Sequence, residues 1–200
     1  MPHRLTTLLL LAGLLVVPAD AAGPSPMLAI QQPEPPVAVC VVTPRVEPVE
    51  DADALGIVPV SRPRLIVVEP LLELRIARPG AATWILTGTR EQPIRTPLDW
   101  PTSPIGPGEL ILLQLRPSEA PAEAFAHVHL VGASETRMAT TERLIRQLAR
   151  QASDWLAAIE SALQAGDVPV AWSLLFAPEA PADPELEDLQ VEVIRRGCGG

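Results

Sequence analysis

The stretch 97–117, PLDWPTSPIGPGELILLQLRP, surrounds one long apolar run with prolines and a tryptophan. It has three possible interpretations: a proline-rich docking motif, a ligand-binding loop around Trp100, or the frame of a β-strand. Pro107 and Pro117 stand at the two ends of the run 109–116, where a missing N–H group costs no hydrogen bond of a sheet. Alternate residues of the run form one apolar face: Ile111, Leu113 and Leu115. We therefore predict a strand at 109–116 and interpret the prolines as its frame.

The residues before this strand have the composition of a turn. In PIGPGE (104–109), proline presets φ and glycine accepts a positive φ. Trp100 lies in the connection that leads into this turn. We predict that its ring caps one end of the protein core, because large aromatic side chains most often serve in packing. The alternative is an exposed tryptophan in a binding loop.

Alternating apolar patterns recur on both sides of this strand. They occur in three further stretches: LLELRIA (71–77), ATWILTG (82–88) and AFAHVHLV (124–131). Short alternating runs separated by proline and glycine turns are typical of antiparallel strands in a sandwich or barrel. The prediction is an antiparallel β-sandwich domain over 37–133, with about seven strands. We expect its core to include Leu72, Leu74, Ile76, Ile111, Leu113 and Leu115.

After residue 133 the apolar period changes from two residues to between three and four. Leu144, Leu148, Ala152, Trp155 and Ile159 recur at this spacing, which predicts one amphipathic helix over about 140–165, ended by Gly166. The region 134–200 is therefore predicted to be a helical C-terminal segment.

Two further helix starts follow in that segment. Asp167 is a candidate N-cap for DVPVAWSLLF (167–176), with Pro169 tolerated in the first turn. Asp183 is a candidate N-cap for a helix at 184–196, which has acidic residues in its first turn and arginines in its last. A final strand over LQVEVI is the competing interpretation, because its apolar residues also alternate.

The first residues have the pattern of a cleavable secretory signal peptide. A short basic start at His3 and Arg4 precedes an apolar run that is shorter than the roughly 20 residues of a membrane-spanning helix. Small residues follow at Ala19 and Ala21, so we expect cleavage after Ala21, leaving residues 1–21 as the signal. Residues 22–36 are proline-rich and are predicted to be an extended leader. The expected mature protein is exported, periplasmic or extracellular, and has no transmembrane segment.

Exported signal, sandwich and helical tail together resemble uncharacterised secreted bacterial proteins that carry an immunoglobulin-like β-sandwich. The resemblance is one of overall pattern and covers about half of the chain. It implies an immunoglobulin-like sandwich for 37–133. The Cys…Trp…Cys spacing of immunoglobulin domains is absent from this sequence.

Charge and cysteine content narrow the possible partners. The formal net charge is −9, and every one of the 15 basic residues is arginine, none of them in a long basic block. Such a chain has no basic surface that would attract nucleic acid or anionic lipid.

Cys40 and Cys198 form an even pair, which is a disulfide candidate in an oxidising compartment. The alternative is a buried Cys40 and an unrelated free Cys198.

The candidate chemical groups are few. His127 and His129 stand two apart on one predicted strand, so both imidazoles lie on one face and can converge on a divalent metal ion. A third ligand would have to be a carboxylate such as Asp99 or Glu109. The competing interpretation is a polar, solvent-facing side of the strand.

The sequence has no G-x-S-x-G elbow and no glycine-rich phosphate loop. The predicted function is a non-catalytic exported module that binds an envelope protein or another cell-envelope component and needs no cofactor. The alternatives are a metal-binding protein using His127 and His129, a structural envelope protein, and a hydrolase using paired carboxylates.

Overall fold

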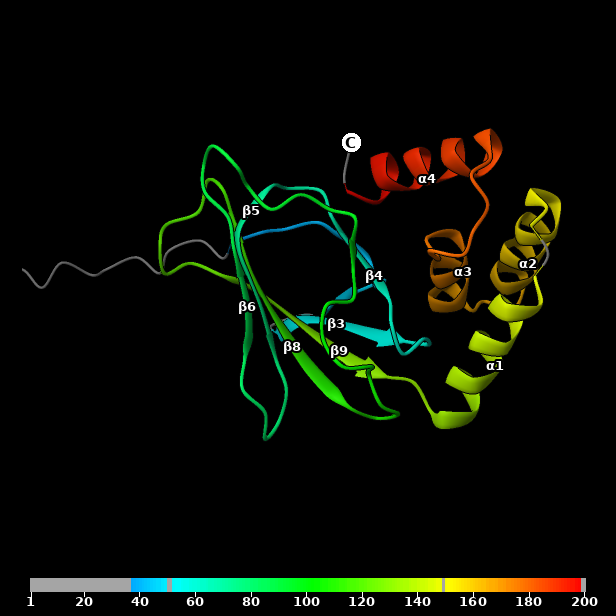
Figure 1. The fold of residues 1–200 in the computed structure, drawn as a ribbon, viewed down its shortest axis with the longest axis horizontal. Helices are drawn as coiled ribbons and strands as arrows, with labels where there is room; N and C mark the ends of the chain where they lie inside the picture. Colours follow the sequence, from blue (N-terminus) through cyan, green and yellow to red (C-terminus); the bar gives the residue numbers. More distant parts are fainter. Residues whose placement is uncertain (1–36, 50–51, 149, 199–200) are drawn as a thin grey trace, which may run out of the picture. The chain divides into compact units, whose positions relative to one another are not determined.

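The computed structural model describes residues 37–49, 52–148 and 150–198 (Figure 1). The predicted signal peptide (1–21) and leader (22–36) lie outside the described residues. Within them, strands come first along the chain and helices follow. The elements are β1 (Val41–Thr43), β2 (Glu47–Val49), β3 (Ala52–Val58), β4 (Arg64–Val67), β5 (Leu71–Ala77), β6 (Trp84–Thr87), β7 (Leu98–Asp99), β8 (Leu110–Pro117), β9 (Ala126–Gly132), α1 (Glu135–Gln147), α2 (Ala152–Gln164), α3 (Val168–Leu175) and α4 (Pro184–Gly197).

The strands form two sheets. A three-stranded sheet has the order β1-β4-β7, and a six-stranded sheet has the order β2-β3-β9-β8-β5-β6. The strands predicted around 71–77, 82–88, 109–116 and 124–131 are β5, β6, β8 and β9. Their predicted core face is confirmed by burial of the following side chains: Leu72, Leu74, Ile76, Ile111, Leu113 and Leu115.

One strand pair contradicts the prediction of an antiparallel fold throughout. β3 and β9 pair in parallel, from Ala54 opposite Val128 to Val58 opposite Gly132. Antiparallel neighbours can be joined by a tight hairpin, whereas parallel neighbours need a long connection. The chain between β3 and β9 contains five other strands, and it therefore returns to the same end of the sheet before β9 begins. The residue pattern of neither strand indicates whether the two strands pair in parallel or antiparallel.

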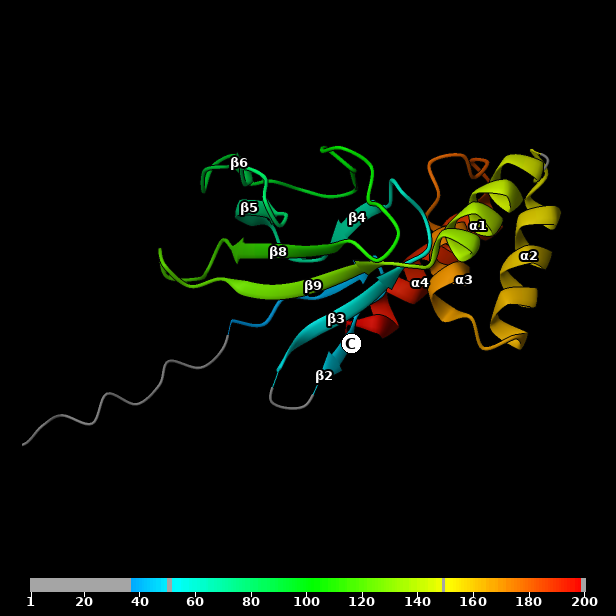
Figure 2. The same ribbon diagram turned by 90° about the horizontal axis from the view of Figure 1, so that it is seen from below.

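The smaller sheet is apolar on both faces and forms a middle layer. Val41, Leu65 and Val67 belong to a first core cluster, shared with the six-stranded sheet. Their neighbours Val42 and Ile66 belong to a second core cluster, shared with the helices. Adjacent residues of a strand point to opposite faces, so this division follows from the geometry of β1 and β4. The helices gather on one side of the strands (Figures 1 and 2).

The turn chemistry of the opening stretch is confirmed, and one arginine holds it in place. Gly108 has a φ of 68° in the turn before β8. Arg78, which follows β5, donates hydrogen bonds to the carbonyl oxygens of Ser103 and Pro104 and to the Oγ1 atom of Thr102. It also pairs with Glu109, at 2.9 Å between Nη1 and Oε1. The proline-rich segment is therefore fixed to the end of the strand next to β8.

The prediction of one helix over 140–165 is wrong. α1 ends at Gln147 and α2 begins at Ala152, with Leu148 in an extended conformation at the C-cap of α1. No glycine or proline stands at 148–151, and the N-cap residue of α2, Gln151, makes no side-chain capping bond. The break therefore comes from tertiary packing, which buries Met138 of α1 and Trp155 of α2.

The other two helix predictions are confirmed. The Asp167 side chain accepts a hydrogen bond from the Val170 amide at the start of α3. The Asp183 side chain accepts one from the Glu185 amide at the start of α4, so the competing strand over LQVEVI does not form. Among the described helices, none has both the length and the hydropathy that crossing a bilayer requires.

Candidate functional site

The two cysteines are bridged. The sulfur atoms of Cys40 and Cys198 are 1.89 Å apart, and the two Cα atoms are 5.6 Å apart, which lies within the range of disulfides. Cys40 immediately precedes β1, and Cys198 is the C-cap residue of α4. The bond therefore ties the end of the last helix to the beginning of the smaller sheet. Both cysteines are only partly buried.

Trp100 is a core residue. Its side chain is 5 % exposed and belongs to the first core cluster, between the sheets. Its indole Nε1–H donates to the carbonyl oxygen of Ser103, 3.0 Å away. The structure therefore corrects the alternative of a binding-loop tryptophan, because the ring is covered and its polar group is satisfied within the protein.

His127 and His129 lie on the outer face of the six-stranded sheet. The Nε2 atom of His127 is 3.2 Å from the side-chain nitrogen of Gln114, and the Nδ1 atom of His129 is 3.6 Å from the Oδ2 atom of Asp53. Both side chains are at least partly exposed to solvent. Through the described ranges of the chain, no group of three or more His, Cys, Asp or Glu residues could hold a metal ion.

The two carboxylates proposed from the sequence as third ligands are engaged elsewhere. Asp99 lies in the smaller sheet and pairs with Arg64, at 3.1 Å between Oδ1 and Nε. Glu109 pairs with Arg78 and accepts a hydrogen bond from the Gly106 amide. The structure brings Asp53, not these residues, next to His129.

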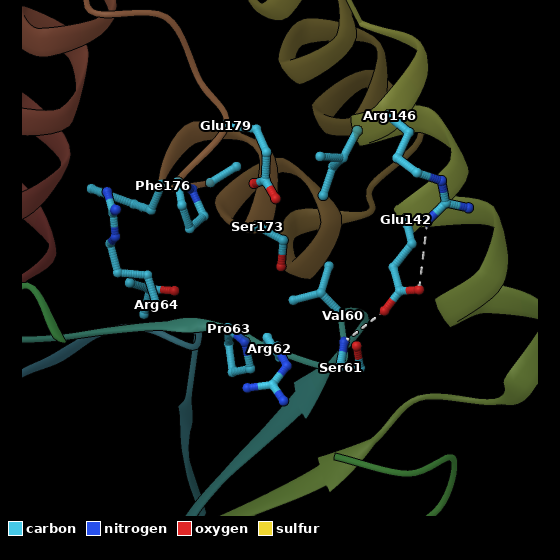
Figure 3. A pocket seen from close by; sticks show the side chains of 14 residues that line it. Val60, Ser61, Arg62, Pro63, Arg64, Glu142, Arg146, Ser173, Phe176 and Glu179 are labelled. Atoms are coloured by element: carbon cyan, nitrogen blue, oxygen red, sulfur yellow. Dashed lines mark hydrogen bonds and ion pairs between the residues drawn. The ribbon is translucent and has the colours of Figure 1, made fainter. Parts of the chain in front are cut away.

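A pocket of about 300 Å³ lies where the turn between β3 and β4 meets the helices (Figure 3). The turn forms one wall, α1 a second, and the end of α3 with the residues after it a third. Apolar side chains supply much of the lining: Val60, Pro63, Ile145 and Phe176. A concave, partly apolar cavity of this volume between layers of a protein is a common form of ligand site.

Glu142 connects the α1 wall to the turn. Its Oε1 atom accepts a hydrogen bond from the Ser61 amide at 3.0 Å, and its Oε2 atom lies 3.9 Å from Arg146, one turn further along α1. Because one carboxylate oxygen binds the backbone of the turn, Glu142 fixes the distance between the two walls. It also presents negative charge at the edge of the pocket.

Two polar groups on the α3 wall point into the pocket without a protein partner. Figure 3 shows the hydroxyl of Ser173 and the carboxylate of Glu179 directed toward the Ser61–Arg64 turn. Neither group has a hydrogen-bond or ion-pair partner in the part of the chain that the structure describes. A hydroxyl and two carboxylates facing one cavity favour a ligand that donates N–H groups.

The arginines of the pocket lie on the turn and at its rim. Arg64 is held by Asp99, and Arg62 makes one long hydrogen bond, 3.4 Å, to the carbonyl oxygen of Thr102. Arg146 is exposed at the end of the α1 wall. The site therefore contains both signs of charge, with the free carboxylate on the helical side.

Sequence reasoning did not find this pocket. Its residues come from four separate parts of the chain: β1, the β3–β4 turn, α1 and the α3 region. None of them forms a motif with a fixed spacing, and only packing of the helices against the smaller sheet brings them together. The one available signal was Glu142, an acidic residue among the apolar positions of a helix.

Comparison with known proteins adds no relative: no family model, no curated protein and no solved structure matches this chain.

Proposed function

We propose that this protein is a non-catalytic exported binding module and that the pocket between the β3–β4 turn and the helices holds its ligand. The observation that carries the proposal is the pair of unpartnered groups, Ser173 and Glu179, directed into a partly apolar cavity. Ser173 is half-buried, and polar groups of this kind normally have partners, so a ligand is a natural source of its missing hydrogen bond. Glu179 is exposed and offers a free carboxylate at the mouth of the pocket. The chemistry favours a basic side chain of an envelope protein, with its stem on the apolar wall and its cation near Glu179.

Two features support a binding role over a catalytic one. The pocket lining includes neither histidine nor cysteine, so Ser61 and Ser173 have no imidazole base beside them there. The outward-facing His127 and His129 belong to the six-stranded sheet, while the pocket is lined by the smaller sheet and the helices.

Export is part of the proposal. The N-terminal pattern of residues 1–21 supports it, and so does the bridged pair Cys40–Cys198, since structural disulfides persist in oxidising compartments. Mass spectrometry of the mature protein from its own envelope or medium should give Ala22 as the first residue. Recovery of the protein with Met1 retained would contradict export by a cleaved signal.

We further propose that the two sheets follow the immunoglobulin-like strand order. In immunoglobulin constant domains, strands A, B and E neighbour one another in one sheet and strands C, F and G in the other. The order β1-β4-β7 and the neighbours β5, β8 and β9 are consistent with these two sets. The disulfide differs, because it joins the residue before β1 to the end of a helix and not the two sheets to each other.

The binding proposal is tested with variants of the pocket. Mature protein would be immobilised and used to capture components of its own envelope fraction, and the same capture would be repeated with Glu179→Gln. Removing the free carboxylate should reduce recovery of the specific partner about tenfold, the effect of losing one charge-assisted hydrogen bond. The captured partner would then be titrated as a purified protein.

A matched control separates this effect from a change in net charge. Glu119 is exposed in the turn after β8 and does not line the pocket, so Glu119→Gln removes the same charge elsewhere. The control should bind as the unaltered protein does. Equal binding by both variants would exclude the pocket as the site.

A further inference from the structure

The disulfide joins two segments that neighbour pocket-lining residues in the sequence. Cys40 stands three residues before Thr43, which lines the pocket from the end of β1. Cys198 ends α4, and α4 follows the pocket wall formed by residues 176–179. Breaking this bond therefore removes the covalent link between the two segments.

Apart from the disulfide, α4 has a limited hold on the protein. The structure describes all of its residues, and Leu186, near the N-terminal end, is the one that is nine-tenths buried or more, at 1 % exposed. Gln190 adds one hydrogen bond, from its Nε2 atom to the carbonyl oxygen of Leu175 at 2.8 Å. Leu189, Val193 and Ile194 pack only partly against the second core cluster, and Val191 is 65 % exposed. In the C-terminal half of the helix, the covalent bond therefore adds to the partial packing of Val193 and Ile194.

The helix carries its own internal stabilisation. Asp183 caps its N-terminus, at 2.9 Å from the Glu185 amide, and Arg195 binds Glu192 through two hydrogen bonds of 2.9 and 2.8 Å in the last turn. These contacts do not involve the rest of the protein. α4 can therefore move as a unit about the proline-containing connection 178–183, whose residues are exposed or only partly buried.

We propose that Cys40–Cys198 is a redox latch that regulates the pocket, an inference that rests on the binding function proposed above. A protein dithiol would reduce the bond: its two thiols become a disulfide, and two electrons and two protons pass to the two cysteines, giving two free thiols. The released α4 then leaves its seat through local unfolding of low-stability contacts. Phe176 and Ala177 share the second core cluster with Leu186 of α4, so the departure of α4 removes packing that holds this part of the binding wall.

Hydrogen–deuterium exchange of the full mature protein tests the latch without any ligand. The oxidised protein and the same protein after treatment with dithiothreitol would be compared peptide by peptide. Exchange in α4 and at 176–180 should accelerate on the order of tenfold or more after reduction and become much faster than exchange in β8, which opens only with the whole fold. The double variant Cys40→Ser/Cys198→Ser should resemble the reduced protein and show no response to dithiothreitol.

Two outcomes would overturn the latch. Unchanged exchange in α4 after reduction would show that its noncovalent contacts suffice. Equal exchange rates in α4 and β8 after reduction would show that α4 opens only with the whole fold and that the bond controls no single element. Because the unaltered protein is reduced after folding, the test stands even where the double variant fails to fold. The two proposals can fail separately. If α4 responds to reduction but Glu179→Gln binds the partner as the unaltered protein does, the pocket function is rejected and the release of α4 stands.

Discussion

Among single residues, Arg78 shows how one side chain organises a proline-rich segment. Its guanidinium is largely buried and binds three consecutive residues, Thr102, Ser103 and Pro104, together with Glu109. Proline lacks an N–H group, so a segment rich in proline has few backbone donors with which to fix itself. The N–H groups of Arg78 supply these missing donors. The carbonyl oxygen of Ser103 also accepts a hydrogen bond from the indole of Trp100.

Replacing Arg78 with Ala should lower the free energy of unfolding by about 1.5–3 kcal/mol, since it leaves Glu109 and several carbonyl groups without their charged partner. Urea denaturation measures this change. Arg90 is an exposed arginine in the connection after β6, and Arg90→Ala should change stability by less than about 0.5 kcal/mol. If Arg78→Ala lowers the free energy of unfolding no more than the control does, the proline-rich segment does not depend on Arg78.

His127 and His129 pose a question at the same scale. Both lie on an outer sheet face, and the carboxylate paired with them, Asp53, stands 3.6 Å from one imidazole alone, that of His129. We predict that neither the unaltered protein nor His127→Gln/His129→Gln changes its melting temperature with zinc or copper. A bound metal would add about 2.7 kcal/mol at a hundredfold excess over Kd. A rise in melting temperature that the double variant lacks would establish a metal site.

At the scale of the element, β8 combines a buried and a partly exposed face within one strand. Leu113 is 0 % exposed between the sheets, whereas Leu110 in the same strand is 45 % exposed. Leu113→Ala should destabilise the protein by about 2–5 kcal/mol through lost burial and a residual cavity. Leu110→Ala is the matched control, with an expected change below about 0.5 kcal/mol, both measured by chemical denaturation. Similar losses in the two variants would contradict the assigned faces.

The elements differ in how well the sequence predicts them, and the difference is physical. β5 and β8 have one buried face, so their alternating apolar residues predict both the strand and the side of it that faces the core. The smaller sheet is buried on both faces, and its runs VAVCVV (37–42) and LIVV (65–68) are continuously apolar for that reason. The boundary between α1 and α2 has no breaker residue, so packing alone determines it. The pocket depends on the same packing, which explains why no local motif predicts it.

On the scale of the whole molecule, the disulfide spans most of the described chain. It joins residues 158 positions apart, and in the chain-entropy description a loop of this length stabilises the fold by about 5 kcal/mol. Dithiothreitol should therefore lower the melting temperature by about 10 °C or more. Thermal unfolding followed by circular dichroism tests this, with Cys40→Ser/Cys198→Ser as the variant that should not respond. Equal melting of the oxidised and reduced protein would contradict a stabilising role.

The middle position of the smaller sheet has a consequence for synthesis on the ribosome. All three of its strands are complete by residue 99, but α3 begins only at Val168. At roughly 5–20 residues per second, the growing chain presents Val42 and Ile66 to its surroundings for several seconds before their cover exists. A chain that stops after residue 133 would keep this face open permanently, and it should bind the dye ANS where the full chain does not. Chaperones that hold exposed apolar strands are the expected protection during this interval.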